Sequence, residues 1–73
     1  MNIMENNKII KVEPIYGWPC EYENGTGIYR IYWNNRMYRF KSHDACLSFV
    51  LMVQQYGIDS DTVKNWLEHN QVK

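Results

Sequence analysis

Two short turn signals, Asn24-Gly25 and Asn34-Asn35, divide the middle of this chain into three segments with the character of strands. Asn-Gly is the strongest short signal for a β-hairpin, because a type I′ turn needs a positive φ at both central residues. Asparagine also tolerates the left-handed region, so Asn34-Asn35 can form a second two-residue turn. The sequence therefore predicts antiparallel strands over residues 18–23, 26–33 and 36–41.

The predicted turns also fix which residues face one another. A two-residue turn at Asn24-Gly25 places Cys20 opposite Tyr29, and the turn at Asn34-Asn35 places Arg30 opposite Arg39. Because side chains alternate along a strand, each face of the sheet collects every second residue. The face nearly free of charge is the predicted core face, and it holds Trp18, Cys20, Tyr22, Tyr29, Ile31, Trp33, Tyr38 and Phe40. The opposite face holds Glu21, Ile28, Arg30, Tyr32, Met37, Arg39 and Lys41.

The segment before these strands is harder to place. Residues 8–13, KIIKVE, are predicted to form a further strand whose pairing partner the sequence does not assign, followed by a turn over residues 14–17. Residues 1–7 show no hydrophobic period, and we expect them to be disordered.

Two helices are predicted after the strands. Ser42 is a natural N-cap for a helix over residues 43–56, which Gly57 ends. Asp59 is the predicted N-cap of a second helix that runs to about Asn70. The sequence thus predicts an α+β fold, as one domain over residues 8–73, in which an antiparallel three- to four-stranded β-meander precedes two C-terminal helices packed on one face.

The first predicted helix is apolar on almost every side. Ala45, Phe49, Met52, Val53 and Tyr56 share the side expected to cover the sheet, while Leu47, Val50 and Leu51 point elsewhere. A helix of this kind needs cover on more than one side. We therefore predict a homodimer that buries Leu47 and Leu51 against a second copy.

Composition and sequence pattern disfavour several classes of protein. The chain has 73 residues, a formal net charge of zero and two cysteines. Zero net charge disfavours a general nucleic-acid binder, and two cysteines are too few for a disulfide scaffold. No signal-peptide pattern is present and the longest apolar run, residues 47–53, cannot span a bilayer, so we expect a cytoplasmic protein without membrane contact.

The predicted hairpin over residues 27–41, GIYRIYWNNRMYRFK, carries four basic residues and no acidic one. Like charges directly opposite each other, as in the pair Arg30 and Arg39, destabilise the pairing of two antiparallel strands. A bound anion, an acidic partner or a carboxylate of the chain itself, for which Glu21 is the candidate, could relieve the repulsion. Aromatic residues, methionine and arginine are enriched at protein interfaces. The predicted partner-binding residues are Arg30, Tyr32, Arg36, Met37, Arg39 and Lys41.

Residues 49–69 resemble a helix-turn-helix. The stretch GIDSDTVKNWL is similar to the turn and recognition helix of many bacterial repressors, and the resemblance implies DNA binding. The chain departs from that pattern because Val53 stands where a small residue is usual, and because Asp61 and Glu68 outnumber Lys64 on the second helix. An acidic helix enters a phosphate-lined groove poorly. The alternative is a helical hairpin that closes the core.

Cys20, His43, Cys46 and His69 supply the residue types of a tetrahedral zinc site. Their spacing lacks the close cysteine pair of such modules, and a free cysteine commonly serves as a small buried apolar residue. We therefore predict free, buried thiols, no metal and no cofactor.

No residue pattern indicates a catalytic site. The sequence predicts a non-enzymatic protein-binding module, an adaptor or inhibitor of phage or mobile-element type, whose partner is a protein with an acidic surface. The alternative is a nucleic-acid-binding or transcription-regulatory protein that uses the basic hairpin or residues 49–69.

Overall fold

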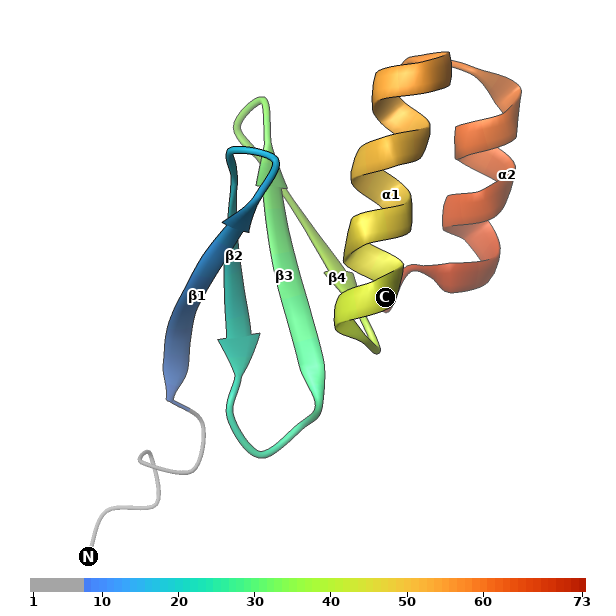
Figure 1. Cartoon of the computed structure of the whole chain (residues 1–73). Helices are drawn as coiled ribbons and strands as arrows, with labels where there is room; N and C mark the ends of the chain where they lie inside the picture. The colour runs from blue at the N-terminus through green and yellow to red at the C-terminus, as the bar shows by residue number, and fades with distance from the viewer. Residues whose placement is uncertain (1–7) are drawn as a thin grey trace, which may run out of the picture.

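The computed structural model describes residues 8–73 and shows four strands followed by two helices (Figure 1). The elements are β1 (Ile9–Ile15), β2 (Trp18–Glu23), β3 (Ile28–Trp33), β4 (Arg36–Phe40), α1 (His43–Tyr56) and α2 (Asp61–Asn70). The strands form one antiparallel sheet in the order β1-β2-β3-β4. The predicted α+β fold is confirmed, whereas the prediction for residues 1–7 lies outside the described residues.

Strand β1, which the sequence left unplaced, pairs with β2 at one edge of the sheet. It runs on to Ile15 instead of ending at Glu13, and the turn after it contains only Tyr16 and Gly17, both with positive φ. The register shifts between Val12 and Ile15, where two residues of β1 oppose one of β2. This β-bulge accommodates Pro14, because a residue in a bulge need not donate to the ladder.

The loop after β2 corrects the predicted register. Residues 24–27 form a four-residue loop, so Cys20 faces Ile31 and Glu21 faces Arg30, two residues away from the prediction. The Thr26 hydroxyl donates to the Glu23 carbonyl at 2.8 Å and accepts from the Ile28 N–H at 3.0 Å, which closes the wider loop. A shift of two residues keeps every side chain on its predicted face.

The turn between β3 and β4 is confirmed. Asn34 and Asn35 have φ values of 53° and 64°, as a type I′ turn requires. Arg30 lies opposite Arg39 as predicted.

The ends of the helices follow from local hydrogen bonds. The Ser42 hydroxyl accepts the Ala45 N–H at 3.1 Å and Gly57 ends α1, as predicted. The N-cap of α2 is Ser60, which accepts the Val63 N–H at 3.1 Å, and not Asp59. Both serine and aspartate are good N-caps, so the sequence alone did not separate these adjacent candidates.

Phe49 of α1 lies at the centre of the core. Its ring contacts Trp18, Tyr38, Phe40 and Trp66 with centroid distances between 4.6 and 6.3 Å. The buried residues of α1 are Cys46, Phe49, Val50 and Val53, which are spaced as one helical stripe. Val50 therefore replaces Tyr56, which is half exposed, in the predicted sheet-facing set.

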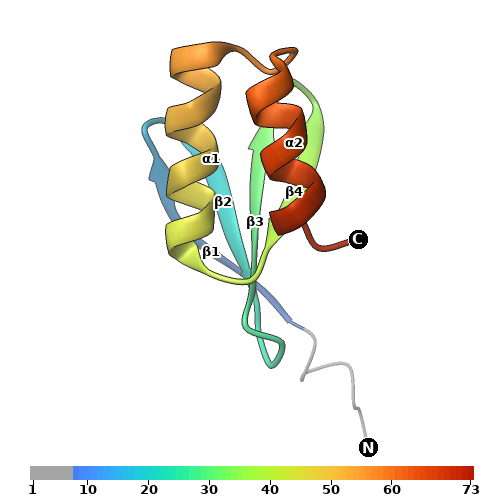
Figure 2. The same cartoon turned by 90° about the vertical axis from the view of Figure 1, so that its right-hand side faces the viewer.

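Both helices lie on the same side of the sheet, with α2 beside α1 toward β4 (Figures 1 and 2). Val63 of α2 is fully buried, and Trp66 and Leu67 pack against the core. Neither helix covers the opposite face of the sheet. Within residues 8–73, no helix is long and apolar enough to cross a membrane.

The position of Phe49 makes a prediction about stability. Phe49→Ala should lower the free energy of unfolding by about 3–5 kcal/mol, because it removes a fully buried ring from four aromatic neighbours. Leu51→Ala on the exposed side of the same helix should cost less than about 1 kcal/mol. Chemical denaturation followed by tryptophan fluorescence measures both values, and equal losses would show that Phe49 is not the centre of the core.

Candidate binding surface

The uncovered face of the sheet carries a cluster of charges around Glu23. Arg39 donates from Nε to Glu23 Oε2 at 2.7 Å and from Nη2 to Oε1 at 2.8 Å. Arg30 donates from Nε to the same Oε2 at 2.8 Å. One carboxylate from β2 thus holds a guanidinium from β3 and another from β4. This arrangement relieves the repulsion that the sequence predicts between the two arginines.

Glu21 has a secondary part in this cluster. It lies 3.7 Å from Arg30 Nη1 and accepts a hydrogen bond from the Tyr32 hydroxyl at 2.7 Å. The sequence identified Glu21 as the bridging carboxylate and missed Glu23. Alternation already placed Glu23 on this face, but only the four-residue loop sets it opposite Ile28, diagonal to Arg30 and within reach of both arginines.

Burial and ion pairing act in opposite directions on Glu23. Its side chain is 9% exposed, and burial alone raises the pKa of a carboxyl group. The hydrogen bonds from Arg39, followed by those from Arg30, outweigh burial and lower the pKa of Glu23 from 4.5 to about 2. The pKa of each arginine is raised, chiefly by its hydrogen bond to Glu23. The cluster is therefore fully ionised at neutral pH.

This cluster changes the electrostatics predicted for the hairpin. Residues 13–23 carry acids and no base and residues 28–41 carry bases and no acid, yet the two segments form neighbouring strands. Arg30 and Arg39 are engaged by Glu21 and Glu23, and Tyr32 is hydrogen-bonded to Glu21. The centre of the face is consequently close to neutral.

The other predicted partner-binding residues remain accessible. Met37 is 42% exposed, and Arg36 and Lys41 are also exposed. None of these three takes part in an ion pair or a side-chain hydrogen bond with another residue between 8 and 73. Arg36 pairs with Trp33 and so lies on the helix side of the sheet, whereas Met37 lies on the uncovered side.

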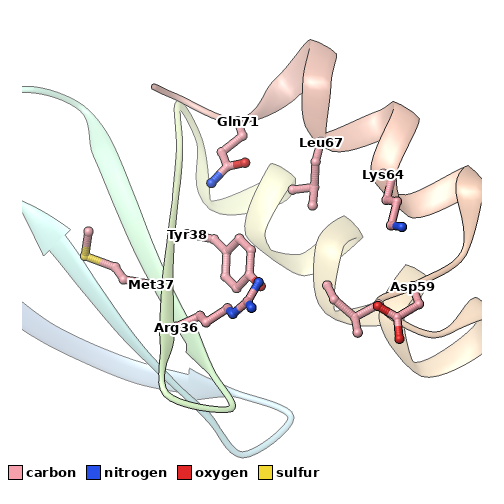
Figure 3. Close-up of a pocket in the computed structure, with 8 residues that line it drawn as sticks. Arg36, Met37, Tyr38, Asp59, Lys64, Leu67 and Gln71 are labelled. Atoms are coloured by element: carbon pink, nitrogen blue, oxygen red, sulfur yellow. The ribbon is translucent and has the colours of Figure 1, made fainter.

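A groove separates β4 from α2 (Figure 3). It has a volume of about 520 Å³ and adjoins a smaller hollow of about 200 Å³ at the tip of the β3–β4 hairpin. We call the larger hollow the β4–α2 groove; its lining residues are Arg36, Met37, Tyr38, Ile58, Asp59, Lys64, Leu67 and Gln71. Sequence reasoning placed Arg36 and Met37 at a binding surface and missed the wall from α2 and the preceding loop, which only tertiary packing brings opposite β4.

The main chain of β4 borders this groove with groups that have no hydrogen-bond partner between residues 8 and 73. A two-residue turn is closed by a hydrogen-bonded pair, here Trp33 and Arg36, and such pairs alternate along an antiparallel ladder. The N–H and C=O of Met37 therefore point away from β3. Beyond them, the Val72 N–H donates to the Arg39 carbonyl at 2.8 Å and Gln71 bridges to Phe40, so the last residues occupy the far end of the edge.

The residues of the other predicted sites are dispersed or structural. Leu51 is 43% exposed, whereas Leu47 packs partly against the core. Residues 49–69 form two helices that lie side by side and run in opposite directions (Figure 1). The homodimer and DNA binding both remain predictions.

Cys20 and Cys46 are free and buried. Burial raises the pKa of both thiols, and that of Cys46 to about 12. His43 packs edge-on against Tyr29, and His69 Nδ1 lies 2.9 Å from the Asn65 carbonyl. Within residues 8–73, no three histidine, cysteine or acidic side chains are grouped as metal ligands.

Comparisons of the chain with protein-family models, curated proteins and solved structures found no match. Its function is therefore inferred from its own residues.

The low pKa of Glu23 predicts an acid-sensitive stability. A carboxyl group whose pKa falls on folding stabilises the folded state above its unfolded value of about 4.5, and loses this effect as the pH falls toward 2. The shift sets an upper limit of about 3 kcal/mol, which partial exposure of the guanidinium groups reduces.

Glu23→Gln should therefore lower the unfolding free energy at pH 7 by about 1–3 kcal/mol and flatten its decline between pH 4.5 and 2. Denaturant titrations at several pH values measure both effects. The control is Glu13→Gln on the exposed edge strand, which should change little at pH 7. Equal acid sensitivity of wild type and Glu23→Gln would contradict the assigned role.

The buried thiols make a second prediction. Native labelling by a thiol reagent should be slow, because protonated, inaccessible sulfurs react only when the fold opens. Both thiols should react at once in denaturant, which provides the control. A chelator should leave the melting temperature unchanged, and stoichiometric zinc in the purified protein would show that the cysteines are ligands.

Proposed function

We propose that this chain is a non-enzymatic protein-binding module whose partner docks along β4. The observation that carries the proposal is the set of unengaged groups gathered at this strand. The outer main chain of β4 is unpaired at Met37, the Met37 side chain is exposed, and Arg36 lies at the groove without an ion-pair partner among residues 8–73.

The charge of the surface supports a partner with acidic groups. Arg36 and Lys41 stand at the two ends of β4, and Lys64 faces the strand from α2 (Figure 3). Asp59 is the acidic residue that lines the same groove. An excess of one positive charge in a concave surface favours encounter with a negatively charged segment.

Protein is favoured over nucleic acid by the distribution of charge. A phosphate backbone is bound by several cations along one continuous surface. Here Arg30 and Arg39 are held by Glu23, while Asp61 and Glu68 lie on α2 beside Lys64. Adaptors and inhibitors act by binding alone, and a domain of this size with an accessible edge strand suits such a role. A homodimer through Leu51 would leave β4 accessible, because Leu51 lies on α1.

The proposal is tested by selecting binders from a displayed library of protein fragments. Fragments selected on the wild-type protein should bind Arg36→Glu/Met37→Glu at least about tenfold more weakly, as expected for the centre of an interface. The matched control is Lys8→Glu, an exposed charge reversal on the opposite edge of the sheet. Melting curves establish that both variants fold.

A labelled single-stranded oligonucleotide and a labelled duplex, titrated at low and raised salt, separate the two candidate functions. Binding that falls steeply with salt, together with no selected fragment, would overturn the protein-binding proposal in favour of nucleic acid.

A further inference from the structure

We infer that the β4–α2 groove binds an extended acidic segment of the partner protein, which adds to β4 as a fifth strand. This inference rests on the proposed function and specifies the chemistry of the partner. It follows from the main chain at the edge of β4, from the state of the opposite sheet edge and from the charges of the groove.

The main chain of Met37 lines the groove. Met37 borders the groove, yet Figure 3 shows its side chain directed away from the other lining residues. Its N–H and C=O point away from β3, as the alternation of the β3–β4 ladder requires. A donor and an acceptor at this position can form two hydrogen bonds with an added strand, which is how edge strands bind extended peptides.

The chain itself shows that this edge accepts an extended segment. The Val72 N–H donates to the Arg39 carbonyl at 2.8 Å, and Gln71 forms an antiparallel bridge with Phe40. Gln71 also lines the groove and marks its closed end. The accessible edge thus runs from Arg36 to Tyr38, which is about 10 Å for three residues of strand. The occupant is therefore a short extended segment.

The opposite edge of the sheet is partly protected, although a hollow of about 310 Å³ lies beside it, lined by Lys11, Val12, Pro14, Pro19, Cys20 and Glu21. Strand β1 contains Pro14 within a β-bulge and carries the charged residues Lys11 and Glu13. Proline, bulges and charged side chains are the usual protections of an exposed edge. Strand β4 also carries charges, at Arg36 and Arg39, but it has neither proline nor bulge, so its main chain is the more regular of the two edges.

The walls of the groove define the side chains of the occupant. Tyr38 is directed from β4 into the groove and Leu67 provides apolar surface opposite it (Figure 3), while Ile58 also lines the groove. Arg36 and Lys64 flank this surface and form no ion pair with another residue between 8 and 73. Alternate side chains of an added strand point to the same face. The occupant then places an apolar side chain on Leu67 and a carboxylate near Arg36 and Lys64.

Asp59 limits where that carboxylate can lie. It lines both the groove and the adjoining hollow at the hairpin tip. A second negative charge beside it would be repelled, so the carboxylate of the segment lies between Arg36 and Lys64 and away from Asp59. Selection of an acidic segment with this pattern distinguishes the groove from a general anion-binding surface.

The probe for the experiment is a phage-displayed library of random linear peptides selected on the full-length protein. The tightest binder is synthesised with free or N-methylated amides, and hydrogen exchange of the protein is followed by NMR. In the free protein the Met37 amide should exchange rapidly, whereas the Tyr38 amide, which faces β3, should be protected. The peptide should protect Met37, and N-methylation of the paired peptide amide should abolish this protection.

Charge reversal tests the side-chain contacts. Arg36→Glu and Lys64→Glu should each lower the affinity of the protein for the selected peptide at least about tenfold, and Lys8→Glu should leave this affinity unchanged. Lys64 is exposed on α2, so its variant retains the fold, and a melting curve verifies this. Selected peptides should be enriched in aspartate and glutamate.

Each of the following results would overturn the inference. Strand addition would be excluded if no peptide were enriched. It would also be excluded if the selected peptides bound without protecting the Met37 amide from exchange and without dependence on Lys64. Protection of Met37 that rises with protein concentration alone would identify a second copy as the occupant. Displacement of the peptide by an oligonucleotide that itself protects Met37 would identify nucleic acid. Fragments that depend on Arg36 and Met37 but not on Lys64 would leave the proposed function intact while refuting the groove as its site.

Discussion

The packing of Phe49 against four aromatic rings determines how the elements of this chain fit together. Its neighbours come from β2, β4 and α2, so one side chain of α1 joins the sheet to both helices. A chain of 73 residues buries a small fraction of its surface compared with larger domains, and large rings offset this deficit. Because these rings occupy one face of the sheet, both helices lie there and the other face remains uncovered.

The uncovered face of the sheet is exposed to water and carries charged side chains, which need partners of opposite charge. Glu23 meets this need by holding Arg30 and Arg39 across three strands. An arginine pair directly opposite would be repulsive without a carboxylate between them. The consequence for function is that two of the most conspicuous cations of the sequence stabilise the sheet, and the cations free to meet a partner lie elsewhere.

The proposed binding surface therefore lies at the edge of the sheet and not on its uncovered face. The β3–β4 hairpin directs the main chain of Met37 outward, and α2 stands opposite with Lys64 and Leu67. Edge strands are usually protected because they attract other strands. Gln71 and Val72 pair with one end of β4, and the other end is open. The open edge is therefore short, and it lies beside a defined groove.

The sequence by itself determined the elements and the two faces of the sheet. Alternation of apolar residues, the Asn34-Asn35 turn, Ser42 and Gly57 are local signals, and each acts through the backbone conformation of its own neighbourhood. They specify strands, helix ends and the pairing of Arg30 with Arg39. The hairpin also supplied Arg36 and Met37 to the predicted partner-binding set, and both residues line the groove.

Tertiary structure decided what depends on contacts between distant residues. The loop after β2 could close with two or four residues without changing the faces of the sheet, because a shift of two preserves alternation. Only the three-dimensional register brings Glu23 to the arginines. In the same way, the packing of Val63 and Trp66 into the core positions α2, and this places Lys64 and Leu67 across from β4. No local signal in the sequence encodes the separation of α2 and β4, because this separation is set by how the aromatic core fills the space between helix and sheet.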